Sequence, residues 1–180
     1  MRMGDLPGRR MGTKRQGYEP SHKPKCLVIV DETPECDRAV HYAARWAQRM
    51  GGQVVMLHVI ETVDRNQEWL GVADIMKAEA DAEAHDALDR ALVRARDFAK
   101  SAVLSDLVPE RVIREGVPAE QIRALIETDT DIVLLILAAA GGPEGPGPIV
   151  TATAKVSGTF PIPVTVVPGH LADDEIDGML

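Results

Sequence analysis

Unbroken apolar runs recur along this chain, and segments with helical spacing separate them. Runs without polar alternation are typical of strands that helices cover on both faces, as in a parallel sheet. The signal is strong in four runs and weak in the third one along the chain, which we expect at or near a sheet edge. The predicted strands cover residues 26–31, 53–60, 110–114, 131–137 and 162–167.

The segments between these runs predict four helices. The first follows Thr33, which we expect to be the N-cap with Pro34 at the first helical position, and Gly51 closes it. The second covers about 74–101, with an apolar stripe expected from Ile75 to Phe98. The third starts at Pro118, and a short fourth covers 149–157. Alternating strands and helices predict an α/β fold with a doubly wound sheet of five parallel strands.

Charge divides the chain into three parts. The formal net charge is −8, yet residues 1–24 are basic and lack periodicity, so we predict a disordered N-terminal arm. Residues 25–169 form the predicted domain, and residues 170–180 form an acidic C-terminal tail. The acidic balance of the domain argues against nucleic acid as its main partner. No stretch approaches the roughly 20 apolar residues that a membrane span needs, so no membrane partner is expected.

Two cysteines, Cys26 and Cys36, are too few for a disulfide framework. Because they fall in a buried strand and in a first helical turn, we expect two reduced thiols in a cytoplasmic protein.

The carboxyl ends of the predicted strands hold the candidate ligand chemistry. Asp31 follows the first strand, where such sheets have their ligand crevice. It either faces a ligand there or closes the turn into the first helix. The loop from Ala138 to Pro148 contains four glycines and three prolines. A glycine-rich loop before a helix can hold phosphate through backbone N–H groups, although each proline removes one donor. The alternative is a rigid loop that caps the sheet.

Nothing in the sequence reads as a catalytic nucleophile. There is no Gly-x-Ser-x-Gly elbow, and the histidines show no metal-ligand spacing. His58 lies within a predicted strand and is expected to be a hydrogen-bonded core residue. We therefore predict no catalytic residues and no metal site.

From about Lys25 to Val167 the chain resembles the universal stress protein family. The resemblance rests on Val-Ile-Val-Asp31, Met56-Leu-His-Val-Ile60, Arg114-Glu-Gly116, Asp131-Ile-Val-Leu and Ile162-Pro-Val-Thr-Val-Val167. It implies a three-layer α/β sandwich with strand order 3-2-1-4-5, of the type shared with adenine-nucleotide α-hydrolases. It also implies homodimers formed through the last strand and no well-defined catalysis.

Nucleotide-binding members of that family carry Gly-x2-Gly-x9-Gly-Ser/Thr after strand 4. Counted back from Pro163, Val150-Thr151 falls on the last pair, while Leu137 and Ala140 replace the earlier glycines. A shifted loop that supplies glycines remains an alternative. The resemblance implies that Asp31 and Val59, with Val30 beside them, contact an adenine and that the hydroxyls contact phosphates. The remaining candidate nucleotide-binding residues are Gly141, Gly142, Gly145, Thr151 and Thr153.

Three functions follow as hypotheses. The first is a non-catalytic, dimeric stress-response or regulatory module with no certain cofactor and an unknown protein partner. The second is a switch of the same fold that binds ATP or AMP. The third is an enzyme that acts on an adenylated small molecule, which the lack of a base, nucleophile or metal set disfavours.

Overall fold

The computed structural model describes residues 13–61, 70–100 and 108–180. Five parallel strands form one sheet in the order β3-β2-β1-β4-β5, which confirms the predicted fold class and order. The strands are β1 (Lys25–Ile29), β2 (Gln53–Ile60), β3 (Glu110–Glu115), β4 (Ile132–Ala139) and β5 (Val164–Pro168). The weakly signalled β3 lies at one edge, as expected, and β5 lies at the other.

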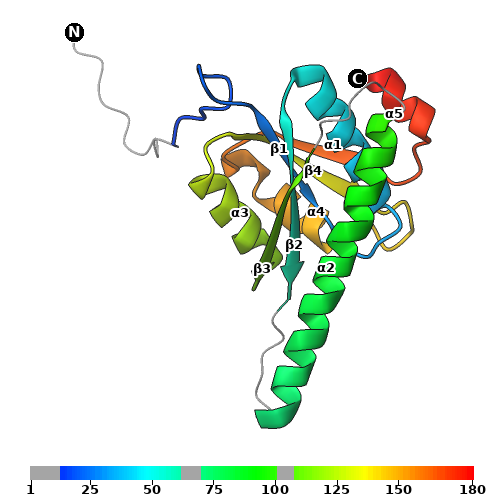
Figure 1. Cartoon of the computed structure of the whole chain (residues 1–180). Helices are drawn as coiled ribbons and strands as arrows, with labels where there is room; N and C mark the ends of the chain where they lie inside the picture. Colours follow the sequence, from blue (N-terminus) through cyan, green and yellow to red (C-terminus); the bar gives the residue numbers. More distant parts are fainter. Residues whose placement is uncertain (1–12, 62–69, 101–107) are drawn as a thin grey trace.

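Helices cover both faces of this sheet (Figure 1). Helix α1 (Cys36–Met50), α2 (Leu70–Lys100) and α5 (Asp173–Met179) lie on one face, and α3 (Pro118–Thr128) and α4 (Pro148–Lys155) lie on the other. A short 3-10 turn, η1 (Ser157–Thr159), follows α4. The apolar runs of β1, β2 and β4 are buried against two separate hydrophobic clusters, one on each face. Burial on both faces explains why these strands show no polar alternation.

The entry into α1 differs from the prediction. The helix begins at Cys36 rather than at Pro34, and Glu35 rather than Thr33 is its N-cap. The side chain of Asp31 accepts hydrogen bonds from the backbone N–H of Thr33 at 3.0 Å and from its hydroxyl at 2.5 Å. Because this local turn holds Thr33 outside the helix, helical geometry starts two residues later.

Helix α2 extends well beyond the ends of the strands (Figure 1). Its buried stripe therefore starts at Ala84, and Ile75 and Met76 are exposed, contrary to the expectation that they face the sheet. Phe98 is among the residues whose side chains are not described.

The terminal segments also differ from expectation. Residues 1–12 of the predicted disordered arm lie outside the described residues, but residues 13–24 are held against the domain. The N–H of Gln16 donates to the carbonyl of Thr130 at 2.9 Å, and Arg15 donates to the carbonyls of Ile126 and Asp129 at the end of α3. The buried Gly17 lies so close to Asp131 that a Cβ would be 2.8 Å from its carbonyl oxygen.

The acidic C-terminal segment is not an extended tail, because it forms α5. Ile176 is fully buried at the centre of this helix, and Leu171 and Leu180 pack against the same cluster at its two ends. The apolar contacts and the acidic side chains both fix the helix on α1, as described below.

Candidate functional site

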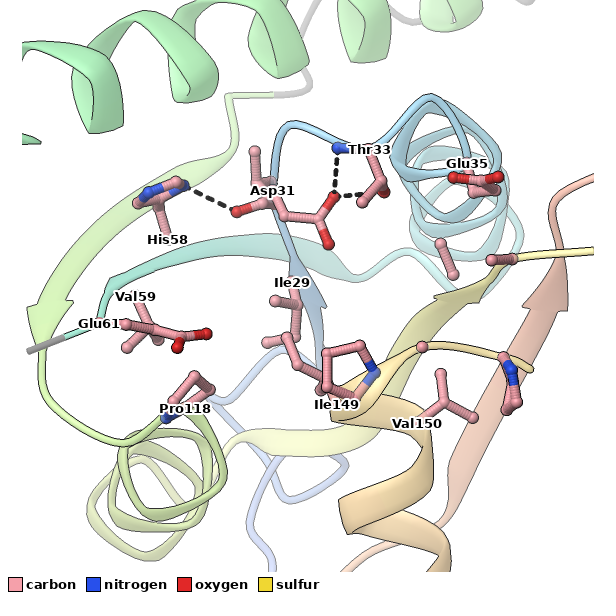
Figure 2. Close-up of a pocket in the computed structure, with 16 residues that line it drawn as sticks. Ile29, Asp31, Thr33, Glu35, His58, Val59, Glu61, Pro118, Ile149 and Val150 are labelled. Carbon is pink, nitrogen blue, oxygen red and sulfur yellow. Dashed lines mark hydrogen bonds between the residues drawn. The ribbon is translucent and has the colours of Figure 1, made fainter. Parts of the chain in front are cut away.

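A pocket of about 180 Å³ opens at the carboxyl ends of β1, β2 and β4 (Figure 2). This is the position at which doubly wound sheets bind ligands, since β1 and β4 are neighbours there but not successive in the chain. The walls are largely apolar. They are formed by Ile29, Val30, Val59, Ala138, Ile149 and Val150, with Pro118 from α3 and Pro146, Gly147 and Pro148 from the loop before α4.

The polar side chains of this pocket are mostly acidic. Asp31 follows β1, Glu61 follows β2, and Glu35 precedes α1, so three strand-end or helix-end segments each supply a carboxylate. Glu61 extends from the end of β2 toward the pocket (Figure 2). No lysine or arginine lines the pocket within the described chain. None of the three carboxylates has an ion pair with a described cation.

Asp31 and His58 are both tied to neighbouring backbone. The turn contacts of Asp31 with Thr33 use one carboxylate oxygen. His58 donates from Nδ1 to the carbonyl of Val30 at 2.8 Å, as expected, but it is half-buried and lines the pocket, so it is not the core residue that was predicted. These bonds fix the backbone at the end of β1, where two of the predicted site residues lie.

Glu35 is positioned by a close approach of the backbone after β5. Gly169 donates to the carbonyl of Ala139 at 2.8 Å. A Cβ at Gly169 would lie 2.2 Å from Cγ of Glu35 and 2.9 Å from the carbonyl oxygen of Ala139. Only glycine leaves room for the Glu35 side chain beside this strand end.

The thiol of Cys36 lies next to this site but is not a nucleophile. Burial raises its pKa to about 12, and Sγ lies 3.8 Å from the carbonyl oxygen of Ile29, to which it donates. Nucleophilic cysteines need a lowered pKa. Cys26 is also a free, buried cysteine, and burial raises its pKa further.

The structure brings together only part of the predicted nucleotide site. Val30, Asp31 and Val59 line the pocket. The other five predicted residues do not line it, and the loop glycines Gly141, Gly142 and Gly145 lie in the exposed or half-buried part of the loop. The hydroxyl of Thr151 donates to the carbonyl of Gly147 at 2.8 Å within α4, and Thr153 is 4% exposed.

Neither Glu61 nor Glu35 is among the site residues predicted from the sequence. Glu61 directly follows β2, so its place at the pocket follows once β1 and β2 are known to be neighbours. Glu35 precedes the first helix, and the sequence alone gives no reason to place it at a pocket. The approach of Glu35 to the pocket depends on Gly169, which lies 134 positions later in the sequence.

The phosphates of an adenine nucleotide do not fit the residues present. Among the described residues, no lysine or arginine lines the pocket, Pro148 at the start of α4 lacks an N–H, and the Thr151 hydroxyl is already bonded. Carboxylates accept hydrogen bonds and repel phosphate oxygens. The apolar walls and the carboxylates suit a ligand that carries hydrogen-bond donors without negative charge.

Across residues 13–61, 70–100 and 108–180, no group of three or more His, Cys, Asp or Glu residues is placed to hold a metal ion. Among the described helices, none is both long and apolar enough to cross a bilayer.

The fold and the pocket define an α/β protein of the doubly wound class with a ligand crevice at its strand ends. The sequence model of the Universal stress protein family matches residues 24–168. The chain therefore belongs to the universal stress protein family, as the resemblance in its sequence predicted.

Solved structures give the same fold. Universal stress protein UspA from Lactobacillus plantarum is similar at a TM-score of 0.63 and 24% identity, over 80% of this chain and 97% of that one. A universal stress protein from Archaeoglobus fulgidus, solved in complex with dAMP, has a TM-score of 0.55 and 17% identity over 80% and 96% of the two chains. Another, in complex with cAMP, has a TM-score of 0.54 and 20% identity over 80% and 96%. No curated protein matches the chain significantly.

Proposed function

We propose that this protein is a non-catalytic, dimeric module of a stress response that does not bind ATP tightly. Membership of the universal stress protein family supports the stress-response role. The observation that carries the proposal is the pocket itself, which presents three carboxylates and no described cation at the strand ends. A cytoplasmic location is part of the proposal, supported by two buried free thiols, which suit a reducing compartment.

Calorimetry with Mg-ATP tests the ATP part of this proposal. We expect a dissociation constant weaker than about 100 μM, which corresponds to about −5.5 kcal/mol. Protein purified without added nucleotide should carry no adenosine phosphate in native mass spectrometry. Micromolar binding of Mg-ATP, or a co-purified nucleotide, would overturn the proposal.

The dimer part of the proposal concerns β5. This strand lies at a sheet edge, and Val166 is 43% exposed on it. An exposed apolar edge strand invites pairing, and a two-fold pairing of β5 with its copy would cover it. Pro161 and Pro163 lack N–H donors, so the ladder would start from Val164.

Sedimentation at micromolar concentration tests this dimer. We expect a dimer for the wild type and a monomer for Val166→Lys. The matched control is Val108→Lys, an exposed valine next to β3 at the opposite edge, which should remain dimeric. A wild-type monomer, or a Val166→Lys dimer of unchanged affinity, would contradict the proposed interface.

A switch that binds a small adenine ligand is the second candidate function. The placement of Val30, Asp31 and Val59 around one pocket favours it. Two structures of similar fold were solved with dAMP and cAMP, which also supports it. Ligand-induced thermal stabilisation of this chain would favour the switch over a module without a ligand.

A further inference from the structure

We propose that the strand-end pocket binds a nucleoside without phosphate, and that Glu35 and Glu61 exclude the phosphorylated forms. This inference rests on the second candidate function, the small-ligand switch. It goes beyond that candidate because it names the charge class of the ligand and the residues that set it.

The walls of the pocket suit the base of a nucleoside, and its size excludes a larger ligand. Its volume of about 180 Å³ lies below the range of roughly 300–1,000 Å³ for pockets that enclose a drug-sized ligand. Ile29, Val59 and Ile149 offer apolar contacts for a base, and their side chains surround the same space (Figure 2). A triphosphate chain would have to extend out of this space past the rim.

The rim of this pocket is acidic. Glu35 and Glu61 approach it from α1 and β2, and Asp31 lies between them at the end of β1. Ionised carboxylates act only as hydrogen-bond acceptors. They can accept hydrogen bonds from ribose hydroxyls or an exocyclic amine, whereas a phosphate group has no donor when ionised and meets like charge.

The N-terminus of α4 offsets this repulsion only in part. A helix start can bind phosphate through free N–H groups, but Pro148 occupies its first position. The N–H and the hydroxyl of Thr151 both donate to the carbonyl of Gly147, at 3.0 and 2.8 Å. The first turn therefore offers a phosphate only the backbone N–H groups of Ile149 and Val150, against the three carboxylates of the rim.

The test is calorimetry with adenosine and with AMP, on the wild type and on the double variant Glu35→Gln, Glu61→Gln. Glutamine keeps the shape of each side chain and removes its charge. We expect the wild type to bind adenosine at least about tenfold more tightly than AMP. The double variant should bring the AMP dissociation constant to within about threefold of its adenosine dissociation constant. Thermal melts verify that each variant is folded.

A matched control separates the pocket from the overall charge of the protein. Glu79→Gln with Glu83→Gln removes the same charge from the exposed surface of α2, so the preference for adenosine should stay as in the wild type. Conversely, Glu61→Arg should reverse the preference and favour AMP.

Four outcomes would overturn the inference. They are AMP binding as tight as adenosine in the wild type, an unchanged preference in the pocket double variant, an equal change in the α2 control, and no adenosine binding at millimolar concentration. If adenosine does not bind and Mg-ATP does not bind either, the inference fails while the proposed non-catalytic module stands. If Mg-ATP binds at micromolar concentration, both fail.

Discussion

Carboxylates have opposite surroundings in two regions of this protein. One region is the strand-end pocket, and the other is the junction between α1 and α5. In the pocket, Asp31, Glu35 and Glu61 face a cavity with no described cation. At the junction, every contacting carboxylate has a cationic or imidazole partner. Asp177 binds Arg45 with two hydrogen bonds, at 2.6 and 2.7 Å, and also contacts His41 at 2.7 Å, while Asp173 contacts Arg38.

The comparison shows what each set of charges does. Carboxylates that meet cations across an interface hold α5 in place around the fully buried Ile176. In the pocket, Asp31 uses one carboxylate oxygen in its turn with Thr33. Glu35 and Glu61 have no described cation beside them, which leaves acceptor capacity for a ligand. The acidic residues at the junction thus stabilise the fold, whereas those at the pocket are proposed to select the ligand by its charge.

The largest effect is expected for Ile176→Ala at the junction. This side chain is fully buried, so its loss should lower the free energy of unfolding by about 2–4 kcal/mol. Urea denaturation measures the change. A loss below about 0.5 kcal/mol would mean that α5 is held by its charges alone or is not docked in solution.

Asp31→Ala should lower the free energy of unfolding by about 1 kcal/mol, because the Thr33 N–H and hydroxyl lose their acceptor. Asp31→Asn is the matched control, since an amide oxygen can still close the turn. Thermal melts of the two variants should therefore differ. Equal melting temperatures for both would show that the turn is not what Asp31 stabilises.

Asp177→Asn should destabilise the protein by about 1 kcal/mol near pH 7, a modest value because the side chain is 38% exposed. The hydrogen bonds from Arg45, and then those from His41, lower the pKa of Asp177 from the usual 3.8. A lowered folded-state pKa means that the stabilisation is present above pH 3.8 and is lost as the pH falls through the folded-state value.

Urea denaturation of wild type and Asp177→Asn as a function of pH checks this sign. The difference between the two proteins should shrink as the pH falls below about 4. A difference that does not shrink in that range would contradict the ion pair seen at the junction.

The smallest effect is expected for Glu61→Gln in the pocket. Because Glu61 is exposed and has no described cation partner, its neutralisation should change the free energy of unfolding by less than about 0.5 kcal/mol. The contrast with Asp177→Asn, measured by urea denaturation under the same conditions, is the informative result. A loss of 1 kcal/mol or more, as at Asp177, would remove the distinction between the two regions.

The sequence predicted the strands and the helices that cover them. It did not predict that α5 docks on α1 or that α2 extends beyond the sheet. The apolar runs of β1, β2 and β4 identify buried parallel strands because helices cover both faces. The docking of α5 could not be predicted, because the segment holds one buried isoleucine among four acids, and its partners Arg38, His41 and Arg45 lie more than 130 positions earlier. The helical pattern of α2 likewise does not reveal how much of the helix lies beyond the sheet.

The sequence predicted only those site residues whose position follows from a single strand or from the resemblance to the family. Asp31 could be placed at a strand end from the run that precedes it, and Val59 from the resemblance to the family. Glu61 becomes a site residue only through the pairing of β1 with β2, and Glu35 only through its contact with Gly169. Thr151 and Thr153 were expected at phosphates, but the start of α4 engages the first hydroxyl and buries the second side chain.

The salt dependence of the preference for adenosine over AMP tests most directly whether the carboxylates at the pocket repel phosphate. If unpaired carboxylates at the pocket repel phosphate, the ratio of the AMP to the adenosine dissociation constant should fall as salt shortens the screening length from about 10 Å at 0.1 M to about 3 Å at 1 M. We predict a ratio of about ten or more at the lower concentration and a decrease of about threefold or more at the higher one, with adenosine affinity nearly constant. A ratio that is independent of salt, or AMP binding that weakens as salt is added, would contradict repulsion of phosphate by these carboxylates.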